Sequence, residues 1–97
     1  MKDIYKDQII KEVATKLDQP TSKTGTAINT FLDLIREKLA GGNRVVLIRF
    51  GAFEVKDRKG RTGRDPHSHL PIEIKASRVV RFKPATTLRR AVRESKL

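Results

Sequence analysis

The chain has no cysteine and no tryptophan, and aromatic residues make up only 5% of its 97 residues. Without cysteine, disulfide bonds and thiolate metal sites are excluded. No apolar stretch approaches the roughly 18 residues that a membrane-spanning helix needs. The first residues, 1–6, also lack the apolar core of a signal peptide. We therefore expect a soluble protein that acts inside the cell.

Acidic residues are scarce as well, with 11 against 22 lysines and arginines, which gives a net charge of +11. Residues 1–43 carry 7 basic and 6 acidic side chains, whereas residues 44–97 carry 15 basic and 5 acidic ones. Like charges at this density repel one another unless a polyanion neutralises them. The distribution therefore predicts that the second half binds a polyanion, either a nucleic acid or an anionic membrane surface.

The first half has the periodicity of two amphipathic helices. Apolar residues recur at helical spacing over residues 3–17, and Asp3 is placed to cap this helix. Pro20 then interrupts the pattern, because proline disfavours a helical conformation in the residue before it. A second pattern covers residues 21–40, with a capping threonine or serine at its start and two glycines after its end. The first half is thus predicted to form a helical hairpin.

From Arg44 onward the apolar period changes from 3.6 to 2, which is the period of a strand. Phe50 and Phe53 lie three residues apart, so an unbroken strand would send their rings to opposite faces. A turn or bulge at Gly51 would return both rings to one core, and we predict the break there.

Residues 56–69 contain almost nothing that could build a core, yet strand alternation resumes over residues 72–82, where only Arg78 interrupts the apolar side. A disordered linker is one interpretation, and a long basic hairpin is the other. We favour the hairpin, which would reach roughly 33 Å, about one turn of duplex DNA. Because such a ribbon leaves about 75 residues for a core, a second copy would be needed to complete it.

The last segment is predicted to be a helix that Pro84 begins. Its inward face would consist of four apolar residues, Ala85, Leu88, Ala91 and Val92. Its arginines also suit a membrane-surface helix, but the face is mostly alanine, and packing on the sheet is favoured.

Residue types that are common in catalytic and metal sites lie close together in the basic segment: Asp65, His67, Ser68 and His69. A metal site needs a third and a fourth ligand, and none is near in the sequence. A Ser-His-Asp triad needs a rigid, partly dry setting, which a charged hairpin tip does not offer. We predict no enzyme, no metal site and no cofactor.

The basic segment itself favours nucleic-acid binding. Arg58, Arg61 and Arg64 recur every three residues, and arginine contacts phosphates with two parallel donors and fits a narrow groove. Pro66 at the presumed tip is either a turn former or an apolar wedge that enters a base step.

Three sequence motifs are typical of a known protein family: Phe50-Gly51-Ala52-Phe53-Glu54-Val55, Gly63-Arg64-Asp65-Pro66, and Phe82-Lys83-Pro84. With them the chain resembles the HU and integration host factor family of bacterial histone-like DNA-binding proteins. The resemblance implies an α+β fold with an N-terminal helical hairpin, a three-stranded antiparallel sheet, a long protruding β-ribbon arm and a short C-terminal helix, in an intertwined dimer. Residues 1–97 would be one domain, divided into a helical dimerisation part (1–43), the sheet and arm (44–83) and the last helix (84–97).

The resemblance also implies a function. The protein would bend and compact duplex DNA through the minor groove with little sequence preference, as a nucleoid-associated homodimer in the cytoplasm; a heterodimer is the other possibility. The residues implied to contact DNA are Lys56, Arg58, Lys59, Arg61, Arg64, Pro66, Lys75, Arg78, Arg81, Lys83 and Thr86. An integration-host-factor-like subunit with a preferred site, a basic RNA-binding protein and a scaffold with incidental charge are the alternatives.

The chain departs from the family pattern at several positions. Arg49 stands where the family usually has glycine, and Asp65 stands where it has asparagine. After the tip proline, Ser68-His69-Leu70 replaces a Thr-Gly-Glu turn. These changes predict an altered tip conformation.

Overall fold

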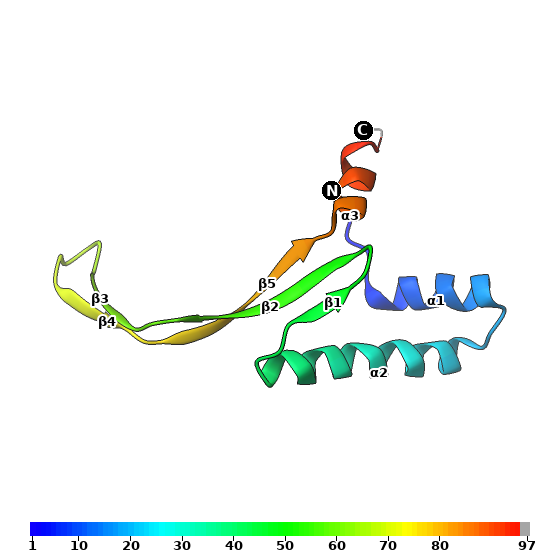
Figure 1. Cartoon of the computed structure of the whole chain (residues 1–97), viewed down its shortest axis with the longest axis horizontal. Helices are drawn as coiled ribbons and strands as arrows, with labels where there is room; N and C mark the ends of the chain where they lie inside the picture. Colours follow the sequence, from blue (N-terminus) through cyan, green and yellow to red (C-terminus); the bar gives the residue numbers. More distant parts are fainter. Residues whose placement is uncertain (96–97) are drawn as a thin grey trace. The chain divides into compact units, whose positions relative to one another are not determined.

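The computed structural model describes residues 1–95, in two compact units, Met1–Glu37 and Lys38 onward. The elements in chain order are α1 (Lys6–Leu17), α2 (Thr21–Ala40), β1 (Val45–Leu47), β2 (Gly51–Arg58), β3 (Arg61–Arg64), β4 (Pro71–Ile74), β5 (Ser77–Pro84) and α3 (Thr86–Arg93) (Figure 1). The predicted α+β fold and its order of elements are confirmed. The last two residues of the predicted C-terminal part, 96 and 97, lie outside the described residues.

The first unit contains α1 and most of α2, which form the predicted helical hairpin, with two differences at the helix starts. Helix α1 begins at Lys6, and the backbone N–H of Tyr5 donates to Oε1 of Gln8 at 2.8 Å. Asp3 therefore precedes the cap, and its prediction as the capping residue is wrong. Helix α2 already includes Thr21, so the predicted hydroxyl cap is wrong too: the carbonyl of Pro20 accepts the first helical bond, from the N–H of Thr24.

Three strands of the second unit form an antiparallel sheet in the order β1-β2-β5. Strands β2 and β5 pair along their whole length, from Gly51 opposite Pro84 to Arg58 opposite Ser77. Strands β3 and β4 form a separate two-stranded ladder, which continues the ribbon away from the sheet (Figure 1). Residues 56–69, for which a linker and a hairpin were the two interpretations, therefore belong to a hairpin. The pairing of its strands is interrupted once, because residues 59–60 and 75–76 belong to neither ladder.

The break between β1 and β2 lies just before the predicted position. The N–H of Phe50 bonds to the carbonyl of Leu47 at 2.9 Å, and Arg49 has a φ of 71°. The chain thus turns over residues 47–50, and Gly51 is already the first residue of β2. Placing the break at Gly51 is wrong, but its predicted consequence is confirmed: the rings of Phe50 and Phe53 lie 5.7 Å and 4.8 Å from that of Phe82.

The last helix also begins later than predicted. Pro84 ends β5, paired with Gly51, and Ala85 precedes the first helical residue, Thr86. The N–H of Ala85 bonds to the carbonyl of Phe50 at 2.9 Å, which fixes the chain against the β1–β2 turn before the helix starts. The predicted inward face is not buried: α3 has no buried residue, and Val92 is 67% exposed.

Each unit leaves large apolar side chains uncovered. The buried apolar residues within residues 1–95 are Ile10, Ala14, Leu39 and Ala52. Exposed large apolar residues come from the helices and the sheet, among them Phe31, Leu32, Leu34, Val46, Val80, Phe82 and Val92. Exposed apolar surface on this scale marks sites of association. No described helix is both long and apolar enough to cross a membrane.

Candidate nucleic-acid interface

The pairing of β2 with β5 places four predicted DNA contacts on one side of the ribbon. Residues opposite each other in an antiparallel pair point to the same face, and faces alternate along the strand. The pairs Phe53–Phe82 and Val55–Val80 therefore define an apolar face. The other face, which we call the basic face, carries Lys56, Arg58, Arg81 and Lys83.

One carboxylate lies among these cations. Oε1 of Glu54 is 3.2 Å from Nε of Arg44 and 3.4 Å from Nζ of Lys83, and Arg81 is its cross-strand partner. The Glu54 side chain is 27% exposed, less than either of its ion-pair partners. Glu54 therefore holds Arg44 and Lys83 at the basic face. Arg44 was missed from the sequence, because its place beside Glu54 depends on the β1–β2 register.

Arg78 lies on the opposite face from Arg81 and Lys83. Its Nε donates to Oδ1 of Asp57 at 2.9 Å, and the two residues are register partners. Its Nη1 also lies 3.5 Å from the carbonyl oxygen of Ala40. The ion pair explains how a single arginine is accommodated on the apolar side, and it separates Arg78 from the other predicted DNA contacts.

The interruption of the ribbon creates a cationic hollow. The side chains of Arg58, Lys59, Arg61 and Lys75 line it, together with Ile74 and Ser77. Gly60 lies close to the opposite strand here, since a methyl group added to it would be 3.1 Å from the carbonyl oxygen of Ile74. Four of the predicted DNA contacts are thus brought together around one hollow, where fixed positive charge favours a phosphate.

The tip of the arm is a turn closed by its own hydrogen bonds. The N–H of Asp65 donates to the carbonyl of Leu70 at 2.9 Å, and the N–H of His69 donates to the carbonyl of Asp65 at 2.8 Å. Oδ1 of Asp65 accepts the N–H of His67 at 2.8 Å. His69 has a φ of 60°, in the left-handed region that glycine favours. The turn therefore adopts this conformation although residue 69 is a histidine. Pro66 follows Asp65 and is exposed.

The start of α3 stands apart from these groups. Thr86 is the first helical residue and is exposed. The hydroxyl of the next residue, Thr87, donates to the carbonyl of Arg49 at 2.7 Å, so α3 is tied to the β1–β2 turn.

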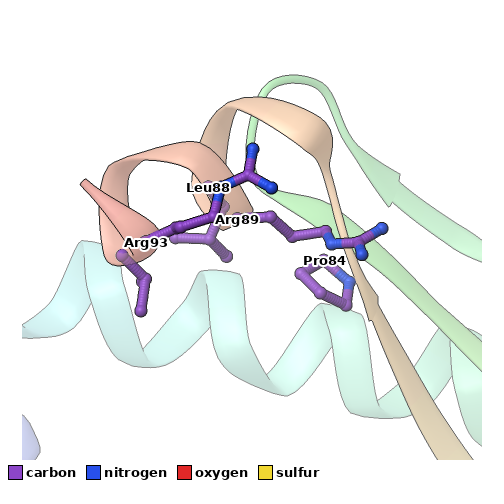
Figure 2. Close-up of a pocket in the computed structure, with 5 residues that line it drawn as sticks. Pro84, Leu88, Arg89 and Arg93 are labelled. Carbon is purple, nitrogen blue, oxygen red and sulfur yellow. The ribbon is translucent and has the colours of Figure 1, made fainter.

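Pro84 and one side of α3 line an open, mostly apolar groove, with Leu88, Arg89, Val92 and Arg93 around it (Figure 2).

Comparison with known proteins identifies the family. The sequence profile of the family described as "Bacterial DNA-binding protein" matches residues 4–93. The chain belongs to this family. The resemblance that the three sequence motifs carried is therefore confirmed, and the protein is a DNA-binding protein of the HU type.

Individual relatives agree with this assignment. The chain is 37% identical over 87 residues to DNA-binding protein HU-beta of Pseudomonas aeruginosa, a match that covers 90% of this chain and 97% of the relative. It is 39% identical over 88 residues to DNA-binding protein HU of Staphylococcus aureus, covering 91% and 98%. Among solved structures, an Anabaena HU–DNA cocrystal structure superposes with a TM-score of 0.82 at 30% identity, covering 95% of this chain and 100% of that one. An HU variant from Thermotoga maritima gives 0.68 at 26% identity, covering 92% and 99%.

Proposed function

We propose that this protein is an architectural DNA-binding protein, which bends and compacts duplex DNA by holding its minor groove between two arms. The observation that carries the proposal is the placement of cations along one ribbon. The basic face of β2 and β5, the cationic hollow and the arginines of the arm follow one another from the sheet to the tip. A ribbon of this kind neutralises phosphates over its length without reading base edges, so sequence preference is small.

Pro66 supplies the wedge in this mechanism. Its ring is exposed at the end of a turn that the Asp65 carboxylate and two backbone bonds hold closed. Proline has no N–H, so inserting it into a base step leaves no donor unpaired. Minor-groove architectural proteins, this family among them, use apolar wedges of this kind. Unstacking a step costs on the order of a few kcal/mol, which the added contacts of the bent duplex offset.

The active form in this proposal is a homodimer of one DNA-binding domain, residues 1–97. The apolar side chains that α2, the sheet and α3 leave exposed support it, because a second copy would cover them. Residues 1–43 would serve dimerisation, residues 44–83 would bind DNA, and residues 84–97 would complete the body. The protein would act at the bacterial nucleoid in the cytoplasm, without catalysis.

The test is a titration of linear, nicked and pre-bent duplexes, and of a structured RNA, over a series of salt concentrations. If the dimer neutralises roughly 6 to 10 phosphates, log K falls against log salt with a slope of about −5 to −9. We expect tighter binding to the nicked and pre-bent duplexes than to the linear one, and the same affinity for unrelated sequences. A slope near zero would refute the charge argument, and preference for RNA would favour the RNA-binding alternative. Strong preference for one duplex sequence would favour an integration-host-factor-like subunit instead.

A further inference from the structure

The arm ends in a second exposed apolar side chain besides Pro66. Leu70 is 63% exposed, more than Ile72 and Ile74 of the strand that follows it, which are 42% and 37% exposed. It closes the tip turn, because its carbonyl accepts the N–H of Asp65. Leu70 is thereby joined by a backbone hydrogen bond to the residue that precedes Pro66, so both apolar residues belong to the same turn, residues 65–70.

The position of Leu70 is fixed rather than left to a loose loop. Its N–H lies 3.3 Å from the hydroxyl oxygen of Ser68, and its carbonyl is held by Asp65. Pro71, the next residue, is paired with Arg64 in the β3–β4 ladder. These bonds hold the backbone of Leu70, so less backbone freedom is lost on binding than in a mobile loop.

The charges around the tip indicate what covers this apolar group. Arg61 and Arg64 lie in β3, the strand that leads into the tip. The carboxylate of Asp65 in the turn accepts the N–H of His67, so the two arginines outnumber it. Arginines beside an apolar end suit a surface with phosphates at its edges and stacked bases between them. The complementary occupant is a base step of duplex DNA.

We propose that Leu70 enters the minor groove together with Pro66, so that the unstacked step is filled by two apolar side chains from each arm. This inference rests on the proposed function. It adds that the wedge is wider than the proline ring alone.

The experiment compares the wild-type chain with Leu70→Asn, Leu70→Met and Pro66→Ala. Asparagine has a similar size but is polar, methionine keeps the apolar volume, and neither changes the charge. A duplex labelled at both ends reports bending by energy transfer, and 2-aminopurine placed at the bent step of a nicked duplex reports unstacking. Circular dichroism and the slope of affinity against salt are recorded for every variant.

We expect Leu70→Asn to lower both the bending and the 2-aminopurine signal, and to weaken binding to the nicked duplex about tenfold. The salt slope should be unchanged, and Leu70→Met should behave as the wild type. If Leu70→Asn matches the wild type while Pro66→Ala loses bending, the inference is overturned and the proposed function stands. If neither variant loses bending, the wedge mechanism fails with it. A change in salt slope or in folding for Leu70→Asn would also overturn the inference, because the effect would then be structural.

Discussion

The guanidinium of Arg78 donates to the carboxylate of Asp57 at 2.9 Å across the β2–β5 ladder, on the opposite face from Arg81. Two arginines only three residues apart therefore serve different purposes. Arg78 neutralises a carboxylate on the apolar side of the ribbon, whereas Arg81 belongs to the basic face that we propose contacts phosphates.

This difference predicts opposite consequences for two alanine substitutions. Arg78→Ala should lower the free energy of unfolding by about 0.2–1 kcal/mol, the range of exposed ion pairs, and leave the salt slope nearly unchanged. Arg81→Ala should weaken binding to all duplex sequences alike and reduce the slope by about 1 for each phosphate that is no longer neutralised. Urea unfolding and titration at several salt concentrations measure the two effects. An equal reduction of the salt slope by both substitutions would show that Arg78 contacts DNA despite its ion pair.

Removing the negative charge from the basic face should strengthen binding. Glu54 holds Arg44 and Lys83, and its carboxylate repels an approaching phosphate. We expect Glu54→Gln to raise the affinity for duplex DNA roughly two- to fivefold at low salt, which corresponds to the worth of an exposed ion pair. Glu12→Gln, which makes the same change of charge in α1, is the control and should have a smaller effect. A weaker complex for Glu54→Gln would mean that Glu54 is needed to orient the cations.

The β1–β2 turn contains a residue in an unfavourable backbone conformation. Arg49 has a φ of 71°, a region that glycine adopts without the clash that other residues incur. Arg49→Gly should therefore raise the free energy of unfolding by about 1 kcal/mol and the melting temperature by roughly 4–8 °C. Arg49→Lys is the control: lysine is as unfavourable as arginine at this positive φ, so the substitution should not raise the free energy of unfolding. A destabilised Arg49→Gly variant would contradict the assigned turn geometry.

The start of β2 has no room for a side chain. A methyl group added to Gly51 would lie 2.5 Å from Cε1 of Phe82 and 2.7 Å from the carbonyl oxygen of Lys83. We expect Gly51→Ala to destabilise the protein by about 1–3 kcal/mol in urea unfolding. Gly25→Ala is the matched control: its methyl group would lie 3.7 Å from Ile10, an ordinary contact, and the substitution should stabilise α2 by up to about 1 kcal/mol. If Gly51→Ala and Gly25→Ala changed the free energy of unfolding equally, Phe82 would have to move away from residue 51 without cost.

Periodicity was sufficient to predict most of the fold, because burial is the reason for periodicity. It identified the helical hairpin, the change to strands at Arg44 and the resumption of alternation after the basic segment 56–69. It failed where a local hydrogen bond decides the boundary. The Tyr5–Gln8 bond starts α1, and a turn through Arg49 occurs although arginine disfavours that conformation.

The site was predictable in its residue types and less so in its arrangement. Parity along the strand already placed Arg78 on the apolar side, but its partner Asp57 is 21 residues away and depends on the register. The same holds for Glu54 with Arg44, and for the hollow around Lys59 and Lys75, which exists only because both strands are interrupted at the same level. A long-range pairing of this kind has no counterpart in local sequence patterns.

The central claim is that the arm grips a distorted duplex, and shortening the arm tests it most directly. Arg58 and Ser77 are register partners, so an asparagine-glycine turn can replace residues 59–76 and join them as a two-residue hairpin. Circular dichroism establishes that the body remains folded, and energy transfer across an end-labelled duplex measures bending at saturation. The account predicts that the shortened protein still binds DNA weakly but no longer bends it or prefers pre-bent duplexes. A folded, shortened protein that bends DNA as much as the full chain would contradict the account.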